Sequence, residues 1–439
     1  MTPQALQSPL RAGQGLAYGL LGLPLAFVAL PLYVLLPNHY AREFGMPLAT
    51  LGGLLLAARL LDAVSDPLLG RLSDHLFGRS ARAVLAVGAV SAVVMALGLT
   101  GLFFPPVQGV RALTAWAFAA LVVTYLAYSQ LGIAHQSWGA RLGGDELQRS
   151  RIVAWREGAA LVGVVLASLL PALAGLPAML GVFALTLGLG WWAWSRAPRP
   201  ATHAAAAWQP AHAAPQPALW RPWQRPAFRR LLAVFVLNGI ASAIPATLVL
   251  FFIQDLLQAP PAQEPLFLGI YFVCAAVSIP LWLRAVARFG LARTWLAGML
   301  LAIAAFSGTA LLGAGDVWPF ALVCALSGVA LGTDLALPSA LLAGVIAAEG
   351  DSGRHEGAYF GWWNLATKLN LALAAGLALP LLGALGYAPG TRSEAGLQTL
   401  SLAYAVLPCA LKLMAAVALY ALILRRLPAG AALPLRGTP

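Results

Sequence analysis

Two carboxylates and one guanidinium lie inside an otherwise apolar segment, at Arg59, Asp62 and Asp66. At helical spacing Asp62 and Asp66 are one turn apart, so their oxygens lie on one face, within reach of Ser65 and Arg59. A charged side chain at the centre of a bilayer costs roughly 2.5–3.5 kcal/mol on insertion scales, so such acids usually mark an ion or proton pathway. The spacing therefore predicts a cation site. The structural alternative is that Asp62 pairs with Arg59 and that Asp66 caps a helix end before Pro67.

The composition indicates that most of the chain is surrounded by lipid. Of its 439 residues, 60% are hydrophobic and only 10% are charged, and the mean hydropathy is +0.81; a soluble domain needs a more charged surface. At about 20 residues per spanning helix, roughly a dozen spans fit. The N-terminal apolar run is long enough to span and lacks a small-residue cleavage pattern, so we expect it to stay as the first helix.

Apolar runs and their interruptions predict the domain organisation. A connection rich in Ala, Pro and His, at 196–229, divides the chain into an N-terminal bundle at 1–195 and a C-terminal bundle with a tail at 230–439. His203 and His212 in this connection are too isolated to predict a metal site. The expected spans lie near 14–37, 45–69, 83–104, 111–138, 152–174, 176–195, 230–254, 265–286, 294–313, 317–345, 358–386 and 398–424. Pro171, Gly175 and Pro177 separate the fifth span from the sixth.

Basic residues set the expected orientation. Lys and Arg concentrate on one set of alternate connections, whereas the other set carries only Arg42, Arg111 and Arg392. The positive-inside rule then places both termini in the cytoplasm, in a multi-pass protein of the inner membrane. Four basic residues remain inside spans, namely Arg59, Arg156, Lys368 and Lys412. The net charge of +12 follows from this topology and does not indicate a nucleic-acid partner.

Other classes of function find little support in the sequence. There is no His-rich box, no Cys/His pair and no Gly-rich phosphate loop at usable spacing, so we expect neither an enzyme nor an organic cofactor. Cys274, Cys324 and Cys409 lack paired spacing and read as packing residues. A membrane scaffold that carries nothing would have no use for two acids one helical turn apart.

Several motifs resemble one family of carriers. The turn from Gly70 to Arg79 resembles the signature loop of the major facilitator superfamily, and a short basic turn recurs at the same place in the second half. The pattern from Arg59 to Gly70 resembles the second helix of the glycoside-pentoside-hexuronide:cation symporters, the melibiose permease group. Similar segments lie at 154–158, 238–248, 271–282, 334–338 and 362–368. The resemblance implies two six-helix halves that alternate access to a central site.

The resemblance also assigns roles. Asp62 and Asp66 would be the carboxylates for the coupling cation, with the Ser129 hydroxyl beside them, while Arg156 and Lys368 would line the central cavity. Sodium needs several oxygens, which Ser65 could complete, and a proton needs only one carboxylate. The hydroxyl on the fourth helix favours Na⁺, with H⁺ as the alternative.

The expected solute is a small organic molecule carried by a monomer in the lipid bilayer. The family's two sugar-contacting aspartates are missing, one from the first span and one near Gly132. Their absence favours a less hydroxylated solute. A lysolipid or other amphiphile is therefore the alternative to a glycoside.

The remaining polar groups of the predicted spans each have two interpretations. Arg156 either lines the cavity or extends to the interface, and Asp334 is either a third acid of the pathway or a partner of Lys368. The other candidates for solute contacts, each of which could equally be a contact between helices, are Gln136, Trp138, Asn238 and Asn364.

Overall fold

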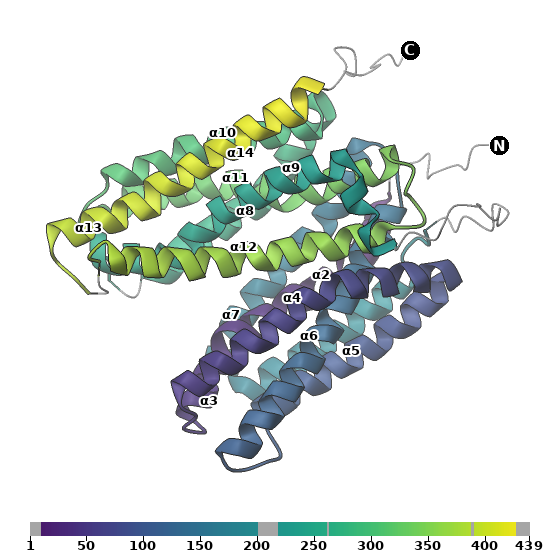
Figure 1. The fold of residues 1–439 in the computed structure, drawn as a ribbon, viewed down its shortest axis with the longest axis horizontal. Helices are drawn as coiled ribbons and strands as arrows, with labels where there is room; N and C mark the ends of the chain where they lie inside the picture. Colours follow the sequence, from purple (N-terminus) through teal and green to yellow (C-terminus); the bar gives the residue numbers. More distant parts are fainter. Residues whose placement is uncertain (1–9, 201–217, 261–262, 388–389, 427–439) are drawn as a thin grey trace. The chain divides into compact units, whose positions relative to one another are not determined.

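The computed structural model describes residues 10–200, 218–260, 263–387 and 390–426. In these ranges the chain forms helices joined by turns and contains no strand (Figure 1). His203, His212 and the rest of 201–217 lie outside the described residues, as do both ends of the chain. The domain boundaries predicted at 195 and 230 therefore enclose a connection of which only the two ends are described.

Contacts between residues divide the chain into two compact units. The first contains residues 1–225 and 343–365, and the second contains residues 226–342 and 366–439. The end of α11 and the beginning of α12 thus belong to the first unit, although the greater part of both helices belongs to the second. The helices of the first unit are α1 (Ala12–Gly19), α2 (Gly22–Phe27), α3 (Leu36–Arg42), α4 (Leu48–Arg79), α5 (Ala81–Phe103), α6 (Val110–Arg141) and α7 (Glu146–Ser195).

The second unit repeats the pattern of long apolar helices joined by short turns. Its helices are α8 (Pro226–Phe251), α9 (Glu264–Phe289), α10 (Leu291–Ser307), α11 (Val317–Ala348), α12 (Glu356–Ala384), α13 (Glu394–Ser401) and α14 (Leu407–Leu422). A π-helical turn joins α13 to α14, so the two form one span. Phe252 and Tyr404 stack at 4.1 Å between ring centroids inside the core of this unit.

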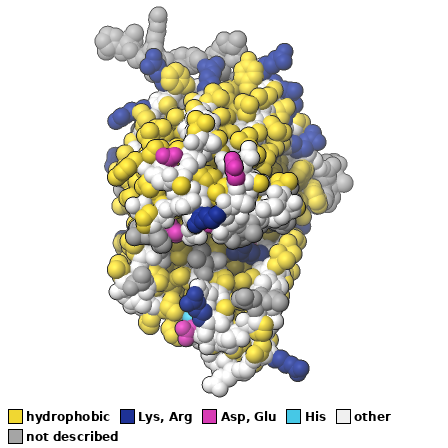
Figure 2. All heavy atoms as spheres, turned by 90° about the vertical axis from the view of Figure 1, so that its left-hand side faces the viewer, with side chains coloured by type: hydrophobic (Ala, Val, Ile, Leu, Met, Phe, Trp, Pro, Cys, Tyr) yellow, Lys and Arg dark blue, Asp and Glu magenta, His cyan; other side chains and the backbone are white. Residues whose placement is uncertain are grey.

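The long helices of the described residues are of membrane-spanning length. Ten of them are long and apolar enough to cross a bilayer, and α4, which carries the two acids, and α12 are of comparable length. Large aliphatic side chains cover the outside, among them Leu173 at 78% exposure and Val277 at 73%, and hydrophobic atoms make up most of the face in Figure 2. Such a surface suits lipid better than water. The predicted all-α membrane architecture is confirmed.

The break between the fifth and sixth spans is where the sequence placed it. Residues 146–195 form a continuous run of helix except at Gly175, whose φ of 79° lies in the left-handed region that favours glycine. Pro177 follows and cannot donate a backbone hydrogen bond. By length and composition the two apolar spans are Glu146–Pro171 and Leu173–Ser195, so Gly175 lies near the start of the second.

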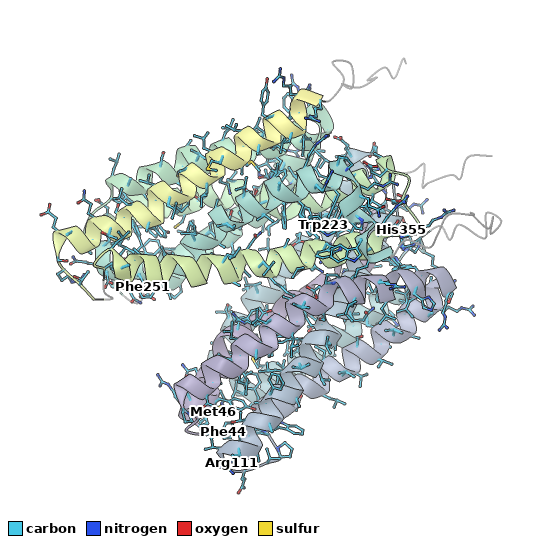
Figure 3. All side chains as sticks on the ribbon, in the orientation of Figure 1. Phe44, Met46, Arg111, Trp223, Phe251 and His355 are labelled. Carbon is cyan, nitrogen blue, oxygen red and sulfur yellow. The ribbon has the colours of Figure 1, made fainter. Side chains whose placement is uncertain are left out.

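The first unit has two distinct ends. Figure 3 shows Phe44, Met46 and Arg111 together at one end, where α3 stops and α6 starts, and Trp223 and His355 at the other. The connection after α3 thus lies at the opposite end of the unit from the turn before α12.

Candidate functional site

Asp62 and Ser129 are brought together in the interior of the first unit. The Ser129 hydroxyl donates to Oδ1 of Asp62 at 2.7 Å, and the two residues are 3% exposed each. α4 and α6 are neighbours, so a residue of the second span can meet one of the fourth. The Ser65 hydroxyl donates instead to the backbone carbonyl of Asp62, at 2.8 Å. The Ser65 hydroxyl hydrogen is donated within α4, and its oxygen can still accept a hydrogen bond or bind a cation.

Asp66 lies fully buried where α4 meets the beginning of α12. A Cβ atom at Gly361 would stand 2.6 Å from the Asp66 carbonyl oxygen, and one at Gly357 would stand 2.1 Å from the Gly70 carbonyl oxygen. Only glycine allows two helix backbones to come this close. Gly357 and Gly361 of α12, four residues apart, together with Gly70 of α4, thus let α12 lie against the acid-bearing segment of α4.

Among the ion pairs of the described residues there is none between Arg59 and Asp62, which the structural alternative proposed. Its guanidinium lies over the ring of Tyr33, 4.4 Å from the centroid. The cation–π contact holds the arginine against the first span. It leaves the Asp62 side chain to Ser129 and to other partners.

Arg156 is buried rather than extended to an interface. It is 8% exposed, and its Nε and Nη2 atoms donate to one carboxylate oxygen of Glu157 at 2.9 Å and 2.6 Å. The pair carries no net charge, which lowers the penalty for burying it. Gly22 of α2 packs on its backbone, where a Cβ atom would stand 2.5 Å from the Arg156 carbonyl oxygen.

Trp138 is a packing residue in this structure, which corrects its assignment to a solute cavity. Its side chain is fully buried, its Nε1 atom donates to the Pro198 carbonyl at 2.9 Å, and its ring meets that of Trp194 edge-on at 5.2 Å. The alternative of a contact between helices is the one observed. Gln136, two residues earlier, is half-buried, and its Oε1 atom has no hydrogen-bond partner in the described part of the chain.

A second polar cluster lies in the second unit, around the carboxylate of Asp334. Oδ2 accepts from Lys412 Nζ at 2.9 Å, and Oδ1 accepts from Trp295 Nε1 at 2.8 Å and from Asn238 Nδ2 at 3.1 Å. The lysine that pairs with Asp334 is thus Lys412 and not Lys368. Sequence analysis placed Lys412 inside the last span without giving it a role. A lysine within an apolar run was the available signal, since such a charge needs a partner.

The other predicted residues lie on α12. Asn364 and Lys368 are both half-buried, one turn apart on the same helix. Asn364 belongs to the part of α12 that groups with the first unit, and Lys368 to the part that groups with the second.

A network of charges joins α4, α6 and the start of α12. Arg141 Nη2 contacts Asp74 and Glu356 at 2.9 Å each, and Asp74 accepts the backbone N–H groups of Gly357 and Ala358 at 2.7 Å and 2.8 Å. Asp74 therefore caps the positive end of the α12 dipole with a side chain from α4. Sequence analysis noted Asp74 only as part of the signature loop.

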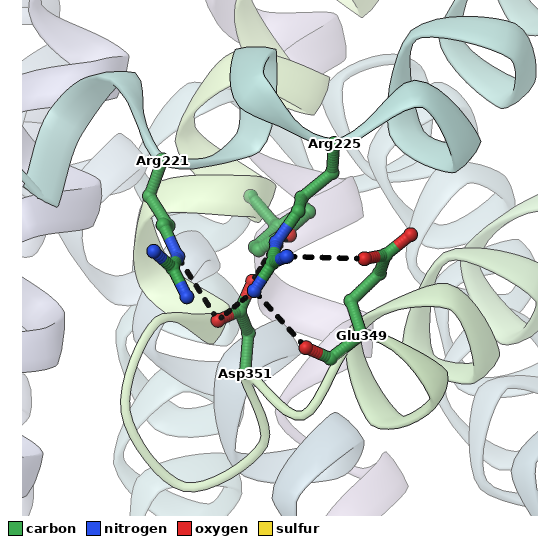
Figure 4. A network of polar contacts seen from close by, with 5 residues as sticks. Arg221, Arg225, Glu349 and Asp351 are labelled. Carbon is green, nitrogen blue, oxygen red and sulfur yellow. Dashed lines mark hydrogen bonds and ion pairs between the residues drawn. The ribbon is translucent and has the colours of Figure 1, made fainter.

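A second network anchors the end of the long connection to the turn before α12 (Figure 4). Asp351 is 2% exposed and accepts from Arg221 Nε at 3.2 Å, from Arg225 Nε at 3.1 Å and from the Tyr359 hydroxyl at 2.8 Å. Arg225 also contacts Glu349 at 3.4 Å. Burial favours a higher pKa for Asp351, but hydrogen bonds from Arg225 and Tyr359 and the arginine charges outweigh it and leave the pKa below its usual value.

The fold and these buried charges define the class of protein, a multi-pass membrane transporter for small solutes. The model of one family, described as MFS/sugar transport protein, matches residues 15–426. The chain belongs to that family, within the major facilitator superfamily.

Two curated relatives match parts of the chain. An uncharacterized symporter of Bacillus subtilis, YjmB, is 26% identical over 171 residues, which is 36% of each chain. A putative glycoside/cation symporter of Escherichia coli, YagG, is 28% identical over 143 residues, which is 32% of this chain and 30% of that protein. The matches thus span about a third of each relative's length.

Solved structures share the fold over nearly the whole chain. A bacterial homologue of the iron transporter ferroportin, in an outward-facing state, has a TM-score of 0.69 at 16% identity and covers 94% of this chain and 99% of its own. The human organic anion transporter MFSD10 gives 0.65 at 20%, covering 93% and 100%. The E. coli fucose:proton symporter FucP gives 0.62 at 15%, covering 92% and 98%. At these identities the likeness shows the fold alone.

Proposed function

We propose that the chain is a secondary active transporter that couples the entry of a cation to symport of a small organic solute by alternating access. The observation that carries the proposal is the buried hydrogen bond between Ser129 and Asp62, one helical turn from the fully buried Asp66. Two acids and a hydroxyl in the interior of a membrane helix bundle form a set of oxygens suited to a cation. The names of the two partial relatives, both symporters, agree with this function.

The proposed cation is Na⁺, with H⁺ as the alternative. Asp62, Asp66 and Ser129 offer carboxylate and hydroxyl oxygens, which are the hard ligands that a small cation prefers. The Ser65 oxygen could complete the set. A proton would need only one of the two acids.

The proposed solute is a glycoside or other small organic molecule, and the proposed location is the inner membrane with both termini in the cytoplasm. The family description and the name of YagG support a glycoside, and the basic residues on alternate connections support the orientation. We propose further that the monomer is the functional unit, since the Asp62–Ser129 pair and the cluster around Asp334 are each built from residues of one chain.

Uptake into proteoliposomes tests this function. The protein is reconstituted, a Na⁺ gradient or a pH gradient is imposed separately, and accumulation of labelled sugars, glycosides, organic acids and lysolipids is measured. We expect accumulation that follows one cation gradient and collapses when that gradient is dissipated. A folded, reconstituted protein that accumulates none of these solutes under either gradient would contradict symport.

A further inference from the structure

Lys412 keeps hydrogen-bonding capacity beyond its ion pair. An ammonium group has three N–H donors. Nζ donates to Asp334 at 2.9 Å and to Ser242 Oγ at 3.0 Å, and no other acceptor in the described ranges is bonded to it. The side chain retains 11% exposure. One donor is therefore left for a group that is not part of the chain described.

Within the described residues, two buried amide oxygens of the second unit lack a donor, one on Asn238, which is bonded to Asp334, and one on Asn370, which lies against Gly239. Asn238 and Asn370 are each 4% exposed, and neither Oδ1 atom has a hydrogen-bond partner among the described residues. Asn238 is held in place by its own bond to Asp334. Asn370 of α12 lies against Gly239 of α8, where a Cβ atom would stand 2.0 Å from its Nδ2 atom. Because Gly239 has no side chain, the Asn370 amide can lie against it, one residue along α8 from Asn238.

Unfilled acceptors and an unfilled donor in one cluster indicate a ligand with hydroxyl groups. Buried polar groups in proteins are nearly always hydrogen-bonded, and a hydroxyl both donates and accepts. Neighbouring hydroxyls could donate to the two amide oxygens and accept from the ammonium group. We propose that Asn238, Asn370 and Lys412 form a hydroxyl-binding subsite for the transported solute, with Asp334 as a positioning residue. This inference rests on the proposed function.

The charge balance of the cluster selects a neutral polyol over an organic acid. The Lys412 ammonium is already neutralised by Asp334 at 2.9 Å. A solute carboxylate would bring a second negative charge next to Asp334 in an environment of low dielectric, where the Lys412 charge is already balanced by Asp334. A neutral polyol adds no charge. Amides in the second unit would then take the role that the missing aspartates leave open.

The amide oxygens have almost no solvent exposure in this conformation, so a solute would reach them in another state of the carrier. Alternating access supplies such states, because a transporter opens its binding residues to each side in turn. We therefore expect the solute to bind only to protein that can change between these states.

Substitution of Asn370 tests the subsite, because Asn370 makes no hydrogen bond within the described part of the chain that the change would remove. Asn370→Leu replaces the amide by an apolar group of similar size. The matched control is Thr333→Val, a fully buried residue of the same unit whose hydroxyl is satisfied by the Ala330 carbonyl at 2.8 Å. The probes for solute counterflow are neutral methyl glycosides, their singly deoxygenated analogues and the matching uronic acids.

For Asn370→Leu we expect affinity for a neutral glycoside to fall about tenfold, the loss of one hydrogen bond, while the cation dependence is retained and Thr333→Val behaves as wild type. The deoxy analogue that lacks the recognised hydroxyl should bind wild type and Asn370→Leu equally, which a general structural defect would not produce.

Three results of the counterflow experiment would overturn the subsite. The first is an equal loss of affinity in Asn370→Leu for the glycoside and for all its deoxy analogues. The others are an unchanged affinity in Asn370→Leu and tighter binding of the uronic acid than of the glycoside. Cation-driven uptake of a solute without hydroxyl groups would refute the subsite and leave symport intact. The absence of any cation-driven uptake by wild type would refute the proposed function itself, and the subsite with it.

Discussion

Ser129 donates its hydroxyl hydrogen to Oδ1 of Asp62 at 2.7 Å, although the two residues are 67 positions apart in the chain. The distance lies in the usual range for a hydrogen bond from a hydroxyl group to an oxygen atom. The bond fixes the direction of one Asp62 oxygen and places a hydroxyl oxygen beside this carboxylate. It makes Ser129 the residue that best separates sodium coupling from proton coupling.

Ser129→Ala should weaken a sodium-driven flux and spare a proton-driven one. Sodium loses an oxygen ligand and a bond that orders Asp62, whereas a proton still finds its carboxylate. We expect the sodium concentration for half-maximal uptake to rise about tenfold or more, as for the loss of a hydrogen bond to a charged group. Ser168→Ala, whose hydroxyl bonds only within its own helix, is the control. Equal loss under both gradients would contradict a role specific to sodium.

Asp62→Asn should abolish cation-driven accumulation while leaving expression and thermal stability near wild type. The change keeps the size of the side chain and removes a buried charge, whose loss from an apolar bundle is not itself costly. Uptake under a cation gradient and unfolding temperature in detergent are measured on the same preparation. Full accumulation by this variant would show that Asp62 is not a cation ligand.

Lys412→Met should destabilise the second unit more than the double change Lys412→Met with Asp334→Asn, whose amide oxygen can still accept from Trp295 and Asn238. Removing one partner of a buried ion pair leaves an unbalanced charge and costs about 3–5 kcal/mol, whereas the double change removes both charges together. Thermal unfolding of the two variants gives the comparison. If the single variant were as stable as wild type, the pair would not be buried in the folded protein in the way described.

Gly357→Ala should separate the start of α12 from α4. The added Cβ atom would meet the Gly70 carbonyl oxygen at 2.1 Å, and backbone cannot give way as a flexible side chain can, so we expect a loss of about 1–3 kcal/mol. Gly78→Ala in α4, where a Cβ atom meets nothing within 4 Å, is the control and should be neutral. Similar unfolding temperatures for the two variants would mean that this close crossing is absent in solution.

Asp351→Asn should lower stability at neutral pH and cost nothing in strong acid. The pKa of Asp351 is held below its ordinary value of 3.8 by Arg225, Tyr359 and Arg221, so the unfolded chain binds the proton more readily. The stabilisation is therefore complete above the ordinary value and is lost as pH falls through the lowered pKa. Unfolding temperatures of wild type and variant at pH 7 and near pH 3 give the difference, with the exposed Glu394→Gln as control. A difference that stayed constant between the two pH values would contradict the ion pair.

The sequence alone predicted the membrane class, the helical spans and the acid-bearing face of α4. These properties are local, because an apolar run of spanning length and two acids one turn apart have the same meaning whatever the neighbouring helices are. The break at Gly175 was predictable for the same reason, since glycine and proline act on the backbone at their own positions. The similarity in sequence motifs added the major facilitator superfamily, which the family model confirms, whereas the melibiose permease group stays a prediction.

Only the tertiary structure decided which polar groups meet. Lys412 and not Lys368 pairs with Asp334, and Trp138 packs on Trp194. Sequence spacing fixes which residues share a face of one helix, but the partner across the contact depends on how helices cross and rotate against each other. That crossing is set by packing over many residues, such as the glycines that bring α12 onto α4, and no short stretch of the chain contains it.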